Sequence, residues 1–247
     1  MHRAGQDGIE IVQFMKAVRQ WQFSFITLLF SVSLATAAQA SPAGSKKILV
    51  LGDSLSSGYG IDLSQGWVQK LKDRLAENQC EDGEAPEGCV PGQWSVINAS
   101  ISGETIGGGL RRLPRLLERS APDVVIVELG GNDGLRGYPV QRMRQELTKL
   151  IEMAQNSDAH VLLVGMMIPP NYGPAYSEAF AAQYTDLSES LEVPLVPFLL
   201  DKVVFTEGYM QEDRIHPTAK AQTQILDNVW PELRDLLREV SGQESSS

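Results

Sequence analysis

Short apolar runs that end in polar turns recur along this chain, and they constrain its fold more than any other feature. Residues 123–129 contain Val-Val-Ile-Val, which is typical of a strand buried on both faces of a sheet. Similar runs predict strands at residues 47–51, 94–101, 160–165 and 195–198. Segments with helical periodicity separate these runs. Because right-handed crossovers place helices on both faces of a parallel sheet, we predict an α/β fold with a mostly parallel sheet of five strands.

The predicted helices contain apolar residues that recur three and four positions apart, as Trp67, Val68, Leu71 and Leu75 do. They occupy residues 66–79, 110–119, 140–154, 177–191 and 218–237. Pro231 lies inside the last of these helices and has no backbone N–H, so we expect it to kink or interrupt that helix.

Residues 1–40 differ in composition from the rest of the chain. Lys16 and Arg19 precede an uncharged apolar run, and Ala38-Gln39-Ala40 provides the small residues that a signal peptidase requires. We therefore predict that residues 1–40 are a signal peptide and that residues 41–247 form one mature domain. A retained membrane anchor is the alternative, but the run is short for a membrane span and lacks a basic stop-transfer flank.

The protein is accordingly expected to be exported, to the periplasm or out of the cell, with no membrane span after cleavage. Translation could begin at Met1 or at Met15, and both starts give the same mature protein. The formal net charge of −10 argues against a nucleic-acid partner, because such a surface repels phosphates. The sequence leaves the oligomeric state open.

Cys80 and Cys89 are the only cysteines, and they flank a polar segment that contains glycine and proline. In an exported protein, a disulfide that closes this segment is the natural interpretation. Two free thiols are the alternative if the protein is not exported. A metal site is not expected here, because no histidine lies nearby in the sequence.

Polar turns follow the first three predicted strands. Gly52-Asp53-Ser54 comes after the first, Ser102-Gly103 after the second, and Gly130-Gly131-Asn132-Asp133 after the third. Ligands of parallel α/β sheets bind outside the carboxyl ends of the strands. These three turns are therefore expected to form a functional site.

Ser54 is the candidate nucleophile of that site, although Gly-Asp-Ser alone favours a plain turn. A serine needs a base, and after residue 40 the chain contains only His160 and His216. His160 begins a predicted strand, at the wrong end of the sheet. His216 precedes Pro217, which biases it toward an extended backbone, and Asp213 is close enough to orient its imidazole. On spacing alone, an Asp that caps the last helix beside an exposed His fits equally well.

Acyl transfer also requires hydrogen-bond donors for the developing oxyanion. Asn132 can offer its side-chain amide. Gly103 has no Cβ, so its backbone N–H can approach a substrate closely. Each of these residues could singly be an ordinary turn residue, but together with Ser54 and His216 they favour a hydrolytic site.

Four segments resemble, in order, the sequence blocks of the GDSL, or SGNH, hydrolases. They are residues 52–56, 98–105, 128–137 and 213–217. The resemblance is close to the bacterial thioesterase I, lysophospholipase and arylesterase group. It implies a flavodoxin-like three-layer α/β/α sandwich without a metal or organic cofactor. It also implies the nucleophile Ser54, the base His216 oriented by Asp213, and an oxyanion hole made by the N–H groups of Ser54 and Gly103 and the amide of Asn132.

The resemblance further implies where an acyl group binds. The segment corresponding to residues 105–110 is a mobile loop near the acyl site in that group, and three consecutive glycines predict flexibility here. Residues 168–173 resemble a loop that we place beside the acyl groove. The expected substrate-binding residues are Ile106, Leu135, Ile168, Pro170 and Tyr172.

Fatty-acyl esters or thioesters, including lysophospholipids and aryl esters, are the substrates that the resemblance implies. A periplasmic carbohydrate acetyl esterase is the alternative enzyme. A binding module that has lost its chemistry is disfavoured, because every residue of the implied catalytic machinery is present.

Overall fold

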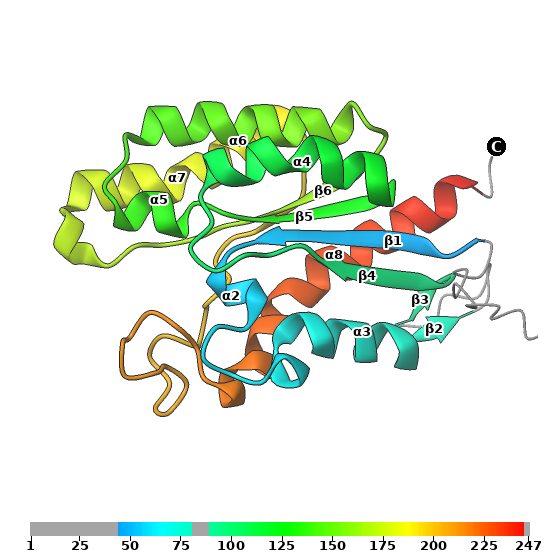
Figure 1. The fold of residues 1–247 in the computed structure, drawn as a ribbon, viewed down its shortest axis with the longest axis horizontal. Helices are drawn as coiled ribbons and strands as arrows, with labels where there is room; N and C mark the ends of the chain where they lie inside the picture. The colour runs from blue at the N-terminus through cyan, green and yellow to red at the C-terminus, as the bar shows by residue number, and fades with distance from the viewer. Residues whose placement is uncertain (1–43, 81–88, 245–247) are drawn as a thin grey trace, which may run out of the picture. The chain divides into compact units, whose positions relative to one another are not determined.

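The computed structural model describes residues 44–80 and 89–244 (Figure 1). The predicted signal peptide and the segment between the two cysteines, residues 81–88, lie outside the described residues.

The core of the described domain is a parallel sheet of five strands, as the sequence predicts. Its strands are β1 (Lys46–Gly52), β4 (Trp94–Asn98), β5 (Val124–Glu128), β6 (His160–Val164) and β7 (Leu195–Val196). They lie in the order β4-β1-β5-β6-β7, so the order reverses at β1. All residues of β5 are buried, which explains its uninterrupted apolar run. The register pairs Gly52 with Glu128 at the carboxyl ends of β1 and β5.

Helices cover both faces of the sheet and complete a three-layer sandwich (Figure 1). The helices α4 (Ile106–Ser120), α6 (Val140–Gln155) and α7 (Pro174–Leu191) lie on one face, and α3 (Trp67–Glu77) and α8 (Gln222–Glu244) lie on the other. Two short helices, α2 (Ser54–Ser57) and α5 (Gly131–Leu135), begin directly after β1 and after the turn that follows β5. The carboxyl edge of the sheet is therefore where α2 and α5 start.

The glycine-rich segment after the second strand is helical, so the prediction of a flexible loop at residues 105–110 is wrong. Helix α4 begins at Ile106, and the Thr105 side chain caps it by accepting a hydrogen bond from the Gly108 N–H at 3.1 Å. Gly109 is buried, and a Cβ there would lie 2.5 Å from a methyl group of Leu129. The glycine therefore permits close helix–sheet packing and does not indicate mobility.

Pro231 does not interrupt α8, which runs from Gln222 to Glu244. Apolar side chains on both sides of the proline, among them Val229 and Leu233, are fully buried. Their burial offsets the backbone hydrogen bond that a proline removes, which costs about 3 kcal/mol in an unsupported helix.

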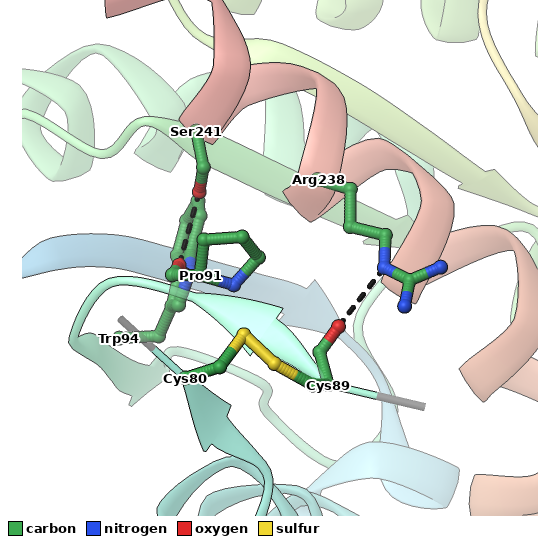
Figure 2. The surroundings of a disulfide bond; sticks show 6 residues. All are labelled: Cys80, Cys89, Pro91, Trp94, Arg238 and Ser241. Carbon is green, nitrogen blue, oxygen red and sulfur yellow. Dashed lines mark hydrogen bonds between the residues drawn. A yellow bond between two sulfur atoms is a disulfide. The ribbon is translucent and has the colours of Figure 1, made fainter. Parts of the chain in front are cut away.

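The disulfide between Cys80 and Cys89 is present, as the sequence predicts, with a Cα–Cα distance of 5.9 Å (Figure 2). It lies at a small parallel pair that the sequence does not predict, β2 (Gln79–Cys80) and β3 (Val90–Pro91). The carbonyl oxygen of Cys89 accepts a hydrogen bond from Arg238 Nε at 2.9 Å, and that of Pro91 accepts one from Ser241 Oγ at 3.0 Å. The disulfide region is thereby attached to α8.

Within residues 44–80 and 89–244, no helix is both long enough and apolar enough to cross a bilayer.

Candidate active site

Ser54 lies at the carboxyl end of β1, where it is the first residue of α2. Asp53 caps this helix, because its Oδ1 accepts a hydrogen bond from the Leu55 N–H at 3.0 Å. Gly58 ends the helix with a left-handed backbone conformation, φ = 75°. The short helix with fixed ends holds the Ser54 hydroxyl at the edge of the sheet.

His216 comes from the other end of the chain, and its Nε2 lies 2.9 Å from Ser54 Oγ. The loop that carries His216 is closed by backbone contacts, including the Gln211 N–H, which donates to the His216 carbonyl oxygen at 2.8 Å. The Tyr59 ring packs against the imidazole with centroids 4.4 Å apart. These contacts hold the imidazole against the serine.

Asp213 orients the same imidazole. Its Oδ2 lies 2.7 Å from His216 Nδ1, and its Oδ1 accepts hydrogen bonds from the N–H groups of Ile215 and His216 at 3.0 Å each. The hydrogen bonds from His216 and Ile215 lower the pKa of Asp213 to about 2. An ionised Asp213 can only accept hydrogen bonds, so Nδ1 carries the imidazole proton and Nε2 is free to accept one from Ser54.

The two candidate oxyanion donors are tied to the same edge of the sheet. Asn132 Nδ2 donates to Asp53 Oδ2 at 3.0 Å, so the amide lies beside the residue that precedes Ser54. Gly103 is exposed with φ = 78°, a conformation that favours glycine, and no atom lies within 4 Å of where its Cβ would be. The neighbouring Ser102 Oγ lies 2.8 Å from Ser57 Oγ in α2. The structure thus brings the three predicted turns together.

Two buried carboxyl groups, Glu128 and Asp133, lie at these turns. The sequence assigns neither of them an individual role, although Asp133 belongs to the third predicted turn. Glu128 is fully buried at the end of β5. Asp133 is 1% exposed, and its Oδ2 accepts a hydrogen bond from the Ile106 N–H at 3.0 Å, which ties the start of α4 to the Asn132 turn. Burial raises the pKa values of Asp53, to about 6, and of Glu128, well above its ordinary range. The only indication of Glu128 in the sequence is that a charged residue ends an otherwise apolar strand.

Residues 50–224 match the model of the GDSL-like Lipase/Acylhydrolase family. The chain belongs to this family. Among its relatives is the Esterase TesA of Pseudomonas aeruginosa, which is 44% identical over 210 residues, with 85% of this chain and 98% of the relative covered. Another is the "Thioesterase 1/protease 1/lysophospholipase L1" of Escherichia coli, which is 38% identical over 220 residues, with 89% and 95% covered.

A solved esterase structure is similar to this fold. The psychrotrophic esterase EstA from Pseudoalteromonas sp., in a crystal structure inhibited by monoethylphosphonate, is 41% identical with a TM-score of 0.70, and 78% of this chain and 99% of that chain are covered.

The residues expected to bind substrate in this GDSL hydrolase differ in how far they are exposed. Ile106 is fully buried in the core, so its predicted contact with substrate is not supported, because the side chain has no surface to offer. Ile168 is 8% exposed. Leu135 and Tyr172 come together, since the Tyr172 hydroxyl donates to the Leu135 carbonyl oxygen at 2.7 Å. Pro170 is exposed in the same short 3₁₀ turn as Tyr172.

His160 begins β6, at the end of the strand opposite the Ser54 edge. It lines a cavity of about 370 Å³ at the amino end of β6, together with the segment that precedes β7 and residues of α8. Residues 44–80 and 89–244 contain no cluster of three or more His, Cys, Asp or Glu that could hold a metal ion.

Proposed function

We propose that this protein is a serine esterase that hydrolyses acyl esters and thioesters through an acyl-enzyme on Ser54. The observation that carries the proposal is the chain of contacts from Asp213 Oδ2 to His216 Nδ1 and from His216 Nε2 to Ser54 Oγ, at 2.7 and 2.9 Å. A serine hydroxyl is activated by such a base, and the base by such a carboxylate.

In the first step, Ser54 Oγ attacks the carbonyl carbon of the ester while its proton passes to His216 Nε2. The carbonyl π bond becomes an oxyanion, and Asp213 stabilises the imidazolium that forms. When the tetrahedral intermediate collapses, the bond to the leaving alcohol or thiol breaks and His216 protonates that group. A water molecule then attacks the acyl-enzyme with His216 again as base, which releases the carboxylic acid and restores Ser54.

The oxyanion is stabilised in this proposal by the N–H groups of Ser54 and Gly103 and by the side-chain amide of Asn132. The positive φ of Gly103 and the hydrogen bond that anchors Asn132 to Asp53 support these roles. Donors held in place before the reaction are effective because they need no reorganisation as charge develops.

The proposed substrates are fatty-acyl esters and thioesters, including lysophospholipids and aryl esters, as the names of the relatives suggest. We place the acyl group beside the turn that contains Ile168, Pro170 and Tyr172, next to Leu135. We also propose that the protein is exported after cleavage at Ala40, which the disulfide supports because such bonds persist in oxidising compartments.

A hydrolysis panel tests this function. The purified protein is assayed with p-nitrophenyl esters of increasing chain length, acyl-CoAs, lysophospholipids and acetylated sugars, with the Ser54→Ala variant as the matched blank. We expect turnover of acyl esters and thioesters that is absent from the variant. Hydrolysis of acetylated sugars alone would instead indicate a carbohydrate esterase, and turnover that survives in Ser54→Ala would refute the nucleophile.

A further inference from the structure

Glu128 is buried directly behind the nucleophile. Its side chain is 0% exposed, and its Oε2 accepts hydrogen bonds from the Asp53 N–H at 3.1 Å and from Ser56 Oγ at 2.6 Å. A Cβ on Gly52 would lie 2.5 Å from this oxygen, so the glycine makes room for the carboxyl group. The groups that Glu128 contacts thus precede and follow Ser54 in the chain.

Asp53 is the second buried carboxyl group, at 2% exposed. Its Oδ1 accepts a hydrogen bond from the Leu55 N–H and its Oδ2 accepts one from Asn132 Nδ2, at 3.0 Å each. Within residues 44–80 and 89–244, neither Asp53 nor Glu128 forms an ion pair with an arginine or lysine. Two adjacent buried carboxyl groups without a cation cannot both be ionised, because each disfavours the charge of the other.

The hydrogen bonds indicate which group holds the proton. Both Asp53 oxygens accept hydrogen bonds, from the Leu55 N–H and from Asn132 Nδ2, and these bonds stabilise the ionised form. Glu128 Oε1 is buried and accepts no hydrogen bond from the described residues, so a charge there would be left unsatisfied. Two other titratable groups interact electrostatically with the pair. Asp133 acts on Asp53, and the buried Tyr184 interacts with both Glu128 and Asp53.

We propose that Glu128 and Asp53 form a carboxyl pair with a single proton, carried by Glu128, and that this pair positions the Asn132 amide as an oxyanion donor. The proposal rests on the acyl-hydrolase function inferred above. An ionised Asp53 only accepts hydrogen bonds, so it binds the NH₂ end of the Asn132 amide and leaves the second N–H for the substrate oxygen. A proton on Asp53 would instead allow the amide to turn its carbonyl oxygen toward the aspartic acid. Glu128 and Asp53 are thus positioning residues, which act through Asn132.

A double-mutant cycle tests the coupling, with p-nitrophenyl acetate as the probe. Asp53→Asn has one acceptor oxygen where the wild type has two, so either the α2 cap or the Asn132 contact is lost. We expect kcat to fall by at least about tenfold in the wild-type background, with KM little changed. In the Asn132→Ala background the same change should cost less than about threefold, because the group through which Asp53 acts is already gone.

The matched control is Asp62→Asn, which alters another aspartate that caps a short helix, through Ser64 N, but has no contact with Asn132. It should leave kcat unchanged in both backgrounds. A loss from Asp53→Asn that persists at threefold or more in the Asn132→Ala background, or that is smaller than tenfold in the wild type, would overturn the positioning role. Thermal unfolding of each variant checks that it is folded. A wild type that hydrolyses no ester would refute the function itself, which is a different outcome.

Infrared spectroscopy tests the proton without any reliance on activity. At neutral pH the wild type should show the C=O stretch of a buried protonated carboxyl group, and E128Q should lack it. The side-chain amide of that variant keeps an N–H where the acid has its O–H, so E128Q should retain most of the kcat that Glu128→Leu loses. A wild-type spectrum without this band, or an E128Q as slow as Glu128→Leu, would overturn the assignment of the proton to Glu128.

Discussion

Replacing Asp213 with Asn changes one oxygen of the carboxylate into an NH₂ group and tests how the imidazole is held. Asn can keep its Oδ1 on the N–H groups of Ile215 and His216, where Asp213 accepts both bonds at 3.0 Å. Its NH₂ group then faces His216 Nδ1, which must accept a hydrogen bond in place of donating one. The imidazole proton moves to Nε2, and that nitrogen can no longer take the proton of Ser54.

The expected loss of kcat depends on how far the Asp213–His216 contact is exposed to water. In serine proteases, where the aspartate is buried, the same change lowers kcat by about 10⁴-fold. The side chain of Asp213 is 40% exposed and that of His216 is 17% exposed, so water can partly compete for Nδ1. We therefore expect Asp213→Asn to lower kcat by on the order of 10³-fold. Asp213→Ala removes the carboxylate but forces no tautomer, and it should lower kcat by a smaller factor, about 10- to 10²-fold.

The assay is steady-state hydrolysis of p-nitrophenyl acetate by the wild type and both variants, with thermal unfolding as the folding control. Asp213→Ala loses three accepted hydrogen bonds that are partly exposed, and it should be destabilised by about 1–2 kcal/mol. Asp213→Asn should be the more stable variant and the slower enzyme. An Asp213→Asn that keeps kcat within tenfold of wild type, or that is faster than Asp213→Ala, would refute the tautomer argument.

Three further perturbations test the fold and the buried carboxyl pair. Replacing Cys80 and Cys89 together by Ser should lower the free energy of unfolding by about 2–3 kcal/mol, because the unfolded chain regains the entropy of the short loop that they close. The change should leave kcat within about twofold, because the disulfide lies at the β2–β3 pair, at the end of the sheet opposite α2 (Figure 1). A large loss of kcat in folded protein would contradict this. Gly109→Ala should destabilise the protein by about 1–3 kcal/mol, because the new methyl group clashes with Leu129. Gly107→Ala is the control and should not destabilise it, because the new methyl group there meets only the flexible ends of side chains. Equal melting temperatures of the two variants would argue against close packing at Gly109. Because the pKa of Glu128 is raised, the folded protein keeps a proton that the unfolded chain releases above pH 4.5, the ordinary pKa of a glutamic acid. Above that pH, the free energy of unfolding of the wild type should therefore fall relative to that of E128Q, by up to about 1.4 kcal/mol per pH unit. Urea titrations that give a constant difference between the two proteins from pH 5 to pH 7 would contradict the raised pKa.

The sheet and the Ser54 contacts were predictable because each depends on a strong local pattern. A fully buried parallel strand must be a continuous apolar run, and β1, β5 and β6 are such runs. Parallel strands place their following turns at one edge, so Ser54, Gly103 and Asn132 could be grouped from strand order alone. The number of histidines left one base that fitted, His216, and the structure places it 2.9 Å from Ser54 Oγ.

Features that depend on packing between distant segments were not predictable. Glycines at residues 107–109 indicate flexibility when taken alone, and the need for Gly109 arises from Leu129 on another element. The continuity of α8 through Pro231 likewise depends on buried contacts on both sides of it. The role of Glu128 could not be inferred, because its hydrogen bonds to Asp53 and Ser56 join residues 75 and 72 positions apart.

The central claim is that Ser54, activated by His216, is the nucleophile, and intact-protein mass spectrometry after treatment with a fluorophosphonate tests it most directly. The wild type should gain the mass of one adduct, and fragmentation should locate it on Ser54. Ser54→Ala should gain none, and its far-ultraviolet circular dichroism should match that of the wild type. An adduct on another residue, or one that forms equally fast on the Ser54→Ala variant, would contradict the account.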